Sequence, residues 1–377
     1  MPRPDSVLVV TDRRLFPPIA GNRARIIEIV RALRAAGLRV ALVARRPRRL
    51  FDRWRTRRLA DAVEWVDAPS FATGPPGRFD CSPFRSGLDA AMRRNDPSAV
   101  IVEYIWMTPA LDALGRDVLK IVDTHDLMHV RRDLYRAAGA GEWVDCSAAE
   151  EAALLRKADV IVANQKNEFA AFAALVPDRR VVYTPYSLPA PARPAGGSPR
   201  HGRVVFVGGD NAGNVDGLRA LVDRAWPVVR RACPEARLRV YGNVGRHAGP
   251  YPPDVTPMGF RRRLASVYGA AAVVVNPVRL GTGLKIKTVE ALMLGKALVS
   301  TSCGAAGLEE GAGAAFECHD DMERFGGAVA RLLADDAARR GLERHAAAFA
   351  LARFGREAAL RDLLGVLRAG PAAPTRP

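Results

Sequence analysis

Short apolar runs alternate along the chain with segments in which apolar residues recur every three or four positions. The runs are rich in β-branched residues and lack polar alternation, which is typical of strands buried on both faces of a parallel sheet. The pattern predicts strands at residues 7–10, 40–44, 99–103, 120–123, 159–163 and 180–184, and again at 204–207, 238–241, 271–276 and 297–301. It predicts helices at about 23–36, 147–157, 215–231, 285–293 and 321–367. This alternation indicates an α/β fold with doubly wound parallel sheets.

A change of composition divides the strand–helix rhythm into two parts. Between residues 185 and 202 the chain contains Pro185, Pro189, Pro191, Pro194, Pro199, Gly196, Gly197 and Ser198. Proline and glycine disfavour regular structure, so we predict a domain at 1–188, a linker at 189–202 and a domain at 203–350. A last helix at about 352–370 is expected to pack back onto the first domain. Two Rossmann-like domains of this kind bind ligands at the carboxyl ends of their strands, so we expect them to face a central cleft.

The overall composition fits a folded protein that remains in the cytoplasm. The 377 residues are 49% hydrophobic and 26% charged, and no apolar run approaches the ~20 residues that span a bilayer. The first ten residues contain only a four-residue apolar stretch, which is too short for a signal peptide. Five scattered cysteines without a C-x-x-C pair indicate neither a disulfide framework nor a zinc site.

The distribution of lysine singles out one segment. Only six of the 57 basic residues are lysine, and three of these fall between residues 285 and 296. The segment 273–308 reads VVVNPVRLGTGLKIKTVEALMLGKALVSTSCGAAGL. A predicted strand leads into the loop Gly281, Thr282, Gly283 and Leu284, and a helix begins near Leu284. Glycine lets the backbone approach a phosphate, and the amides of a helix start attract anions. Lys285 and Lys287 add charge, and the carboxylate of Glu290 can accept hydrogen bonds from ribose hydroxyls. A plain helix start with a Lys287–Glu290 pair is the alternative.

This segment resembles the donor-binding region of retaining glycosyltransferase family 4, a group 1 family with the GT-B fold. Residues 203–209 with Asn214, and Gly259 and Phe260 with Tyr268, are similar to neighbouring parts of the family's second domain. The resemblance implies that Glu290 holds the ribose and that Gly208, Gly209 and the 281–284 loop bind the donor. Thr282 stands where the family usually has a glutamate, and the family's basic pair is absent at residues 208–211. We therefore expect Lys285 or Lys287 to neutralise the donor diphosphate.

The first domain also contains segments that resemble the family. Asp123-Thr124-His125-Asp126 follows a predicted strand and resembles the family's histidine-containing loop, which implies that His125 lies near the reacting sugar with Asp126 beside it. Arg131 is expected to serve the same region. Gly21, Asn22 and Arg23 resemble the glycine loop that faces phosphate and acceptor, with one glycine in place of the common two.

Two readings of the metal chemistry follow from the residues. His125 and His129 are spaced i, i+4, which on a helix can hold a metal ion. No D-x-D triplet, the metal-holding pair of other glycosyltransferases, occurs in the chain. We favour catalysis without a metal or other cofactor, in which the helix start, loop amides and lysines stabilise the leaving diphosphate.

An arginine-rich stretch at residues 45–58 suggests a second kind of partner. It contains Arg45, Arg46, Arg48, Arg49, Arg53, Arg55, Arg57 and Arg58, interleaved with Leu50, Phe51 and Trp54. Basic residues beside apolar anchors suit an anionic membrane surface, and a solvated loop is the alternative. No nucleic-acid-binding module is evident, so no nucleic acid is expected.

Together these features predict a glycosyltransferase that moves a sugar from a nucleotide-sugar donor to an acceptor hydroxyl with retention. The acceptor would belong to polysaccharide, glycolipid or secondary-metabolite glycosylation. A sugar-nucleotide 2-epimerase of the same architecture, and a degenerate homologue that only binds nucleotide, are the alternatives.

Overall fold

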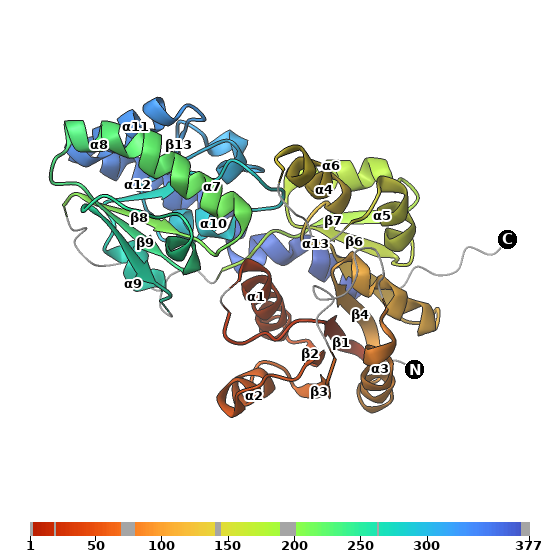
Figure 1. The fold of residues 1–377 in the computed structure, drawn as a ribbon. Coiled ribbons are helices and arrows are strands. Elements are labelled where there is room, and N and C mark those ends of the chain that lie inside the picture. Colours follow the sequence, from red (N-terminus) through yellow and green to blue (C-terminus); the bar gives the residue numbers. More distant parts are fainter. Residues whose placement is uncertain are drawn as a thin grey trace. The chain divides into compact units, whose positions relative to one another are not determined.

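The structure of the chain is a computed structural model, which describes residues 3–18, 20–68, 80–139, 145–188, 201–261 and 264–370 (Figure 1). Contacts divide the chain into two compact units. The first unit comprises Met1–Ser187 together with Ala359–Pro377, and the second comprises Leu188–Ala358. Most of the predicted linker, 189–200, lies outside the described residues.

The first unit is built on a seven-stranded parallel sheet in the order β3-β2-β1-β4-β5-β6-β7. Its strands are β1 (Arg3–Thr11), β2 (Arg39–Arg45), β3 (Ala62–Val66), β4 (Pro97–Glu103), β5 (Leu119–Asp123), β6 (Val160–Ala163) and β7 (Arg180–Tyr183). The order reverses between β1 and β4, and this switch point is where doubly wound sheets bind ligands.

Helices cover both faces of this sheet. They are α1 (Gly21–Ala35), α2 (Leu50–Arg57), α3 (Ser82–Asn95), the 3-10 helix η2 (Ile105–Ala113), α4 (Met128–Ala137), α5 (Ala148–Leu155), α6 (Lys166–Leu175) and the C-terminal α13 (Arg356–Ala369).

Alternate residues of the central strand explain the two covered faces. Val7 and Val9 of β1 belong to one apolar core, which also contains Leu360 and Leu363 of α13. Leu8 and Val10 belong to the other core. Because successive side chains of a strand point to opposite faces, an unbroken apolar run requires helices on both sides. The C-terminal helix therefore completes the core of the first unit, although nearly all of the second unit precedes it in the sequence.

The second unit contains a six-stranded parallel sheet in the order β10-β9-β8-β11-β12-β13. Its strands are β8 (Arg203–Val207), β9 (Arg237–Tyr241), β10 (Val255–Gly259), β11 (Val273–Asn276), β12 (Leu298–Ser300) and β13 (Glu317–Cys318). Its helices include α7 (Ala212–Ala220), α8 (Trp226–Ala232), α9 (Leu264–Gly269), α10 (Ile286–Met293), α11 (Met322–Ala334) and α12 (Asp336–Phe354). Here the strand order reverses between β8 and β11.

The predicted α/β class and doubly wound parallel sheets are confirmed, while several boundaries differ. The predicted helix 215–231 forms as part of a continuous helical segment, 212–232, in which the π-helical turn η3 (Leu221–Ala225) joins α7 to α8. The helical tail is three helices, broken at Asp335 and Gly355. Strands β3, β10 and β13 were not predicted: β3 is only partly buried and β13 has two residues, so neither presents a long apolar run.

Candidate functional site

In the second unit, the segment singled out by its lysines lies at the switch point of the sheet. β11 ends at Asn276 and the following loop leads through Gly281, Thr282, Gly283 and Leu284 to α10. Gly281 and Gly283 have positive φ angles of 128° and 74°, a region that L side chains rarely adopt, so glycine is required at both turns. Gly208 and Gly209 follow the neighbouring strand β8. The predicted donor-binding loops thus meet at one edge of one sheet.

Lys285 closes this loop on itself. Its ammonium donates hydrogen bonds to the carbonyl oxygens of Gly281, Thr282 and Gly283 at 3.2, 2.8 and 2.9 Å. Lys285 is also the N-cap residue of α10 (Ile286–Met293), which agrees closely with the helix predicted at 285–293. The charge of Lys285 therefore fixes the shape of the loop at the start of the helix.

Two glycines of α7 allow this loop to lie directly on the helix. A Cβ atom at Gly213 would come within 2.3 Å of the Leu280 carbonyl oxygen, and one at Gly217 within 2.6 Å of the Pro277 carbonyl oxygen. Sequence reasoning missed these residues, although their i, i+4 spacing places both on one face of a helix. Any side chain at either position would displace the strand-to-loop connection from α7.

The ammonium of Lys287 is partly buried, and the groups that it contacts directly are neutral. Its ammonium donates to the Asn214 side-chain oxygen and lies 4.7 Å from the centre of the Phe206 ring. Asn214 in turn donates to the Gly209 carbonyl oxygen at 3.0 Å. Burial lowers the pKa of Lys287 to about 7, and the neighbouring charge of Lys285 contributes to this decrease. An anion that binds beside this ammonium would stabilise its charged form.

Glu290 lies one turn further along α10 and accepts a hydrogen bond from the Tyr268 hydroxyl at 3.2 Å. Burial raises the pKa of Glu290 to about 7, against the opposing effect of this hydrogen bond. Lys287 and Glu290 thus have different hydrogen-bond partners, Asn214 and Tyr268. The simple surface pair between them, which the sequence left open as an alternative, is not the arrangement that forms.

In the first unit, two adjacent strands end in carboxylates. Glu103 of β4 and Asp123 of β5 are partners in the parallel register, so their side chains lie side by side. Arg25 of α1 forms two hydrogen bonds of 2.8 Å with Asp123 and a third with the Thr184 carbonyl oxygen. All three charged groups are buried. Burial and the neighbouring Asp123 charge raise the pKa of Glu103 well above its usual range.

His125 joins this buried network directly after β5. Its Nε2 lies 2.7 Å from Glu103 Oε2, and Asn164 donates to its main-chain oxygen at 2.6 Å. Burial lowers the pKa of His125 to about 3, so the imidazole is neutral at physiological pH. Its φ of 63° is unusual for a residue other than glycine, and such backbone strain concentrates at functional sites. Once Nε2 binds Glu103, Nδ1 is the ring nitrogen that remains for a ligand.

Tyr104 connects the predicted residues of this unit. Its ring stacks on His125 with centroids 3.9 Å apart, and its hydroxyl hydrogen-bonds with the Asn22 side chain. Asp126 lies beside it and forms an ion pair of 3.5 Å with Arg131. Asn22, Arg23 and Gly21 form the first turn of α1. The structure thus brings Asn22, His125 and Asp126 around Tyr104 beside the β1/β4 switch point, and Arg131 joins this group through Asp126.

The helical metal pair considered for His125 and His129 does not form. His125 lies in the loop before α4, and His129 on α4 bonds Glu151 at 2.7 Å. Among the described residues, Glu103, Asp123 and His125 are the group whose ligand atoms come close enough to hold a metal ion. Arg25 already engages both oxygens of Asp123, and its guanidinium would repel a cation there. The donor set therefore fits an ion-pair network better than a metal site.

Sequence reasoning did not anticipate Arg25, Glu103 or Tyr104. Glu103 carried a detectable signal, because it is an acid that closes an apolar strand beside another strand that also ends in an acid. Arg25 carried none, because its helical segment is rich in arginine and only packing decides which guanidinium is buried.

Family models match both units. One described as "Glycosyl transferase 4-like domain" matches residues 20–187, and one described as "Glycosyl transferases group 1" matches residues 201–335. Together these models cover most of the chain. The two domains belong to the glycosyltransferase families that the models describe, and the protein is a glycosyltransferase of the GT-B type.

Solved structures share this fold at low sequence identity. Sucrose-phosphate synthase from Thermosynechococcus elongatus is 17% identical with a TM-score of 0.71, covering 97% of this chain and 98% of that one. Anabaena HepE in complex with UDP is 14% identical with a TM-score of 0.69, covering 97% and 100%. TarM is 8% identical with a TM-score of 0.73, covering 96% and 98%. No curated protein matches the sequence.

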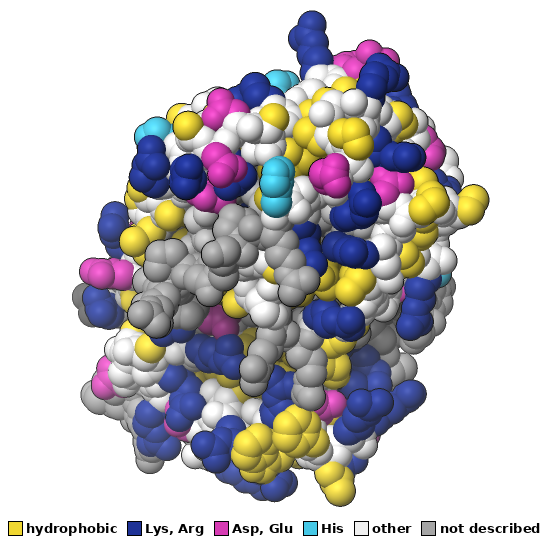
Figure 2. All heavy atoms as spheres, turned by 90° about the vertical axis from the view of Figure 1, so that its left-hand side faces the viewer, with side chains coloured by type: hydrophobic (Ala, Val, Ile, Leu, Met, Phe, Trp, Pro, Cys, Tyr) yellow, Lys and Arg dark blue, Asp and Glu magenta, His cyan; other side chains and the backbone are white. Residues whose placement is uncertain are grey.

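The arginine-rich stretch begins at the last residue of β2, continues through the short connection 46–49 and then forms the helix α2. Leu50, Phe51 and Trp54 of α2 are 76%, 57% and 52% exposed. Figure 2 shows hydrophobic side chains low on this face, surrounded by lysine and arginine. Across the part of the chain that the structure describes, no helix is both long and apolar enough to span a membrane.

Proposed function

We propose that this protein transfers a sugar from a nucleotide-sugar donor to an acceptor hydroxyl, and that its second unit binds the donor. The observation that carries the proposal is the arrangement around α10. The glycine-shaped loop 281–284 leads into the amide-rich start of the helix, with Lys287 and Glu290 on the following turn. An ammonium suited to a diphosphate and a carboxylate suited to ribose hydroxyls lie in the order in which a nucleotide presents these groups.

The roles of individual residues follow from their contacts. Lys285 holds the loop, so Lys287 is the lysine that we assign to the diphosphate, joined by the amides of Gly208, Gly209 and the loop. Glu290, steadied by Tyr268, accepts from the ribose. Thr282 offers a hydroxyl in place of a carboxylate toward the sugar. HepE, which shares this fold, has been solved in complex with UDP and with UDP-glucose, and this supports a nucleotide sugar as the ligand here.

In the first unit we assign His125 to the transferred sugar. A neutral imidazole fixed by Glu103 presents Nδ1 as a hydrogen-bonding atom without placing a full positive charge beside an oxocarbenium-like centre. Asp126 and Arg131 form an adjacent polar pair that suits acceptor hydroxyls. We further propose retention of configuration and catalysis without a metal ion, in which protein cations and amides stabilise the leaving diphosphate.

The test is a thermal-shift screen of UDP-, GDP- and dTDP-linked sugars, followed by turnover assays with the best donor. Ligand binding to the folded state raises the melting temperature. Glu290→Gln, which keeps size and removes the carboxylate, should weaken donor binding about tenfold or more, a loss of the size expected for a charge-assisted hydrogen bond. Glu323→Gln on the exposed first turn of α11 is the matched control.

The reaction products distinguish a transferase from a 2-epimerase and from a homologue that only binds nucleotide. Release of nucleoside diphosphate with transfer or hydrolysis of the sugar supports a transferase. Isomerisation of the donor without mass change supports a 2-epimerase. Donor binding without any turnover, equal in wild type and Glu290→Gln, leaves only a nucleotide-binding homologue and refutes the proposal.

We also propose that α2 attaches the protein to an anionic membrane surface. Phe51 and Trp54 stack with ring centroids 5.7 Å apart, and Arg58 lies 5.0 Å from the Trp54 ring centre. A hollow of about 220 Å³ beside them is lined by Phe16, Arg31, Arg34, Trp54, Arg55, Arg58 and Leu59. Apolar anchors rimmed by guanidinium groups match the acyl and headgroup layers of an anionic bilayer.

A flotation assay tests this attachment with phosphatidylglycerol-containing and pure phosphatidylcholine vesicles. We expect wild type to float with the anionic vesicles, and Leu50→Ser/Phe51→Ser/Trp54→Ser to remain below. Leu351→Ser, an exposed apolar residue on α12, is the control. Equal flotation of wild type and the triple variant on anionic vesicles would remove α2 as the anchor.

A further inference from the structure

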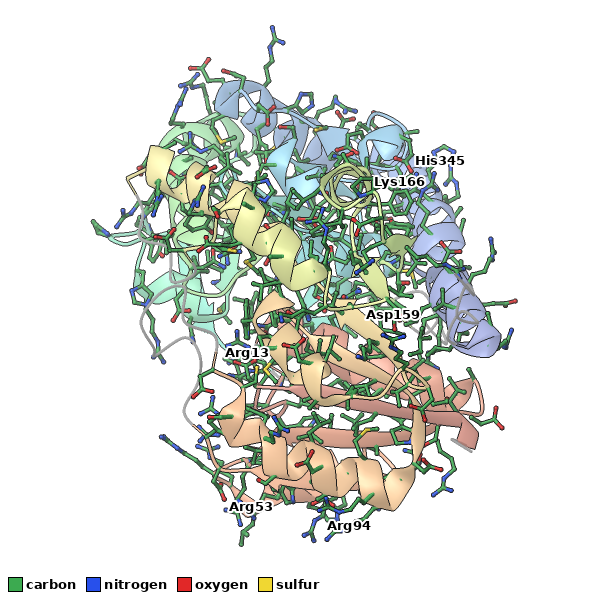
Figure 3. The ribbon with its side chains drawn as sticks, turned by 90° about the vertical axis from the view of Figure 1, so that its right-hand side faces the viewer. Arg13, Arg53, Arg94, Asp159, Lys166 and His345 are labelled. Atoms are coloured by element: carbon green, nitrogen blue, oxygen red, sulfur yellow. The ribbon has the colours of Figure 1, made fainter. Side chains whose placement is uncertain are left out.

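Four arginines of the first unit gather at the carboxyl edge of β1 and β2. β1 ends at Thr11, which pairs with Ala44 of β2, so Arg45 lies beside the residues that leave β1. Arg13 and Arg14 follow β1 at once, and Arg23 lies in the first turn of α1. Figure 3 shows Arg13 at an end of the strands of the first sheet, well apart from Arg53. We call Arg13, Arg14, Arg23 and Arg45 the arginine edge.

Backbone carbonyls, which are neutral, hold three of these side chains. Arg14 Nε donates to the Arg46 oxygen at 2.9 Å and Arg45 Nε to the Ala68 oxygen at 2.8 Å. Arg23 Nη1 donates to the Pro17 oxygen at 3.2 Å. Within the described residues, none of these three is ion-paired with a carboxylate. The carbonyls therefore orient the guanidinium groups without neutralising them.

The arginines are close enough to oppose one another's charge. Burial, followed by the charges of Arg13 and Arg14, lowers the pKa of Arg23. Burial, followed by the charge of Arg14, lowers the pKa of Arg45, while Asp12 opposes this change. Like charges gathered at a partly buried edge are costly unless an anion joins them.

Two further features complete an anion-binding arrangement. The N-terminus of α1 has no side-chain cap and no acidic residue in its first turn, so its amides add to the positive potential. Arg13 lies 5.1 and 5.3 Å from the ring centres of Tyr104 and Trp106, which form an aromatic floor. Asp12, buried and 3.1 Å from Arg13, offsets one of the four charges. The arginine edge thus keeps an excess of positive charge, and Arg13 places it in contact with Tyr104.

We propose that the arginine edge binds a phosphate group carried by the acceptor substrate. A phosphate matches this edge better than a single carboxylate, because it brings up to two negative charges and three oxygens to several guanidinium groups. The inference rests on the proposed transferase function and adds the chemical class of the acceptor: a phosphorylated sugar, polyol or lipid. The donor diphosphate is the other source of the same chemistry, so the test must distinguish the two.

The experiment measures binding of inorganic phosphate by isothermal titration calorimetry with the donor site filled by the nucleoside diphosphate found in the thermal-shift screen. The proteins are wild type, Arg14→Gln/Arg45→Gln and Arg237→Gln. Arg237 is the control, because its guanidinium also donates to backbone carbonyls, those of Pro234 at 3.1 Å and Ala236 at 2.8 Å, and it lies at the start of β9 in the second unit. Melting temperatures without phosphate verify that each variant folds.

We expect phosphate to bind wild type in the presence of nucleotide, and the double variant to bind it at least tenfold more weakly. Nucleoside diphosphate affinity should stay within twofold in all three proteins, and Arg237→Gln should bind phosphate as wild type does. Three results overturn the proposal: no phosphate binding by wild type, equal binding by the double variant, or a nucleotide that blocks phosphate while the double variant loses nucleotide affinity. The last result would assign the arginines to the donor. Donor turnover is measured separately, so loss of the transferase proposal is recognised independently of phosphate binding.

Discussion

In both units the candidate site lies at the switch point of a parallel sheet, but the two sites are built from different kinds of chemical group. At the β1/β4 switch point, charged side chains dominate, with the buried Arg25–Asp123 pair below His125 and the arginine edge beside it. At the β8/β11 switch point, glycines shape the backbone, and Lys287 and Glu290 are held by neutral partners, Asn214 and Tyr268. The difference teaches that one architecture can present either a fixed set of charges or a shaped main chain to a ligand. Substitutions should therefore damage the two units in different ways.

The largest expected effect is on the folding of the first unit. Arg25→Met leaves Asp123 buried beside Glu103 without its cation, so the free energy of unfolding should fall by about 3–5 kcal/mol. Urea denaturation measures this change. Arg34→Met is the control, because Arg34 pairs with Asp61 at 2.8 Å at the exposed surface, and should cost about 1 kcal/mol or less. Equal losses in both variants would contradict the assigned role of the buried pair.

The second unit should respond most to a methyl group on α7. Gly213→Ala places a Cβ against the Leu280 carbonyl oxygen, so we expect about 1–3 kcal/mol of destabilisation together with loss of donor binding. Gly327→Ala is the matched control, since a Cβ there meets no atom within 4 Å and the residue lies in helix α11. The control should be neutral or stabilised by up to about 1 kcal/mol. Calorimetric melting and donor titration of both variants decide the comparison.

A smaller expected effect is the change of donor affinity with pH. The pKa values of Lys287 and Glu290 are both about 7. Diphosphate binding requires charged Lys287, so donor affinity should fall as pH rises above 7, by at most about tenfold per unit for one proton. Ribose binding requires ionised Glu290, so affinity should also fall as pH drops below 7. Lys285 and Cys303 near Lys287, and Tyr268 near Glu290, are the other titratable groups there.

Single variants assign the two limbs of this pH profile. Lys287→Met should flatten the alkaline limb and Glu290→Gln the acid limb, with weaker binding overall in each. A nucleotide sugar is the right probe, because its diphosphate is esterified at both ends and does not titrate near neutrality. A profile that keeps both limbs in both variants would show that other groups control binding.

The smallest expected effect is the change in donor affinity when Lys287 loses its hydrogen-bond partner Asn214. Asn214→Ala removes the side chain that accepts from Lys287 and donates to Gly209, so donor affinity should fall about three- to tenfold, the value of one or two neutral hydrogen bonds. Asn243→Ala in the 3-10 helix η4 (Asn243–Arg246) is the control. No change in affinity for Asn214→Ala would mean that Lys287 is held by packing on Phe206 alone.

The apolar runs were sufficient to predict the fold class and most strands. Runs such as 7–10 lack polar alternation, and only a sheet covered on both faces can bury them. The pattern failed where burial is partial, as in β3, and it gave no sign of the π-helical turn η3 inside the helical segment 212–232. It also described the arginine stretch only as a charged segment, because exposed Leu50 and Phe51 break the usual apolar face of a helix.

By itself, the sequence determined the alternation of strands and helices and the local chemistry of the 281–290 segment, because glycine turns and helix starts depend on neighbouring residues. Only the tertiary structure decided which of many arginines are buried, which lysine closes a loop, and which carboxylate meets His125. These outcomes depend on contacts between segments up to 159 residues apart, as in the bond from Arg25 to Thr184. Burial and charge compensation between such segments depend on how the segments pack, so the pattern of residues along the chain does not predict them.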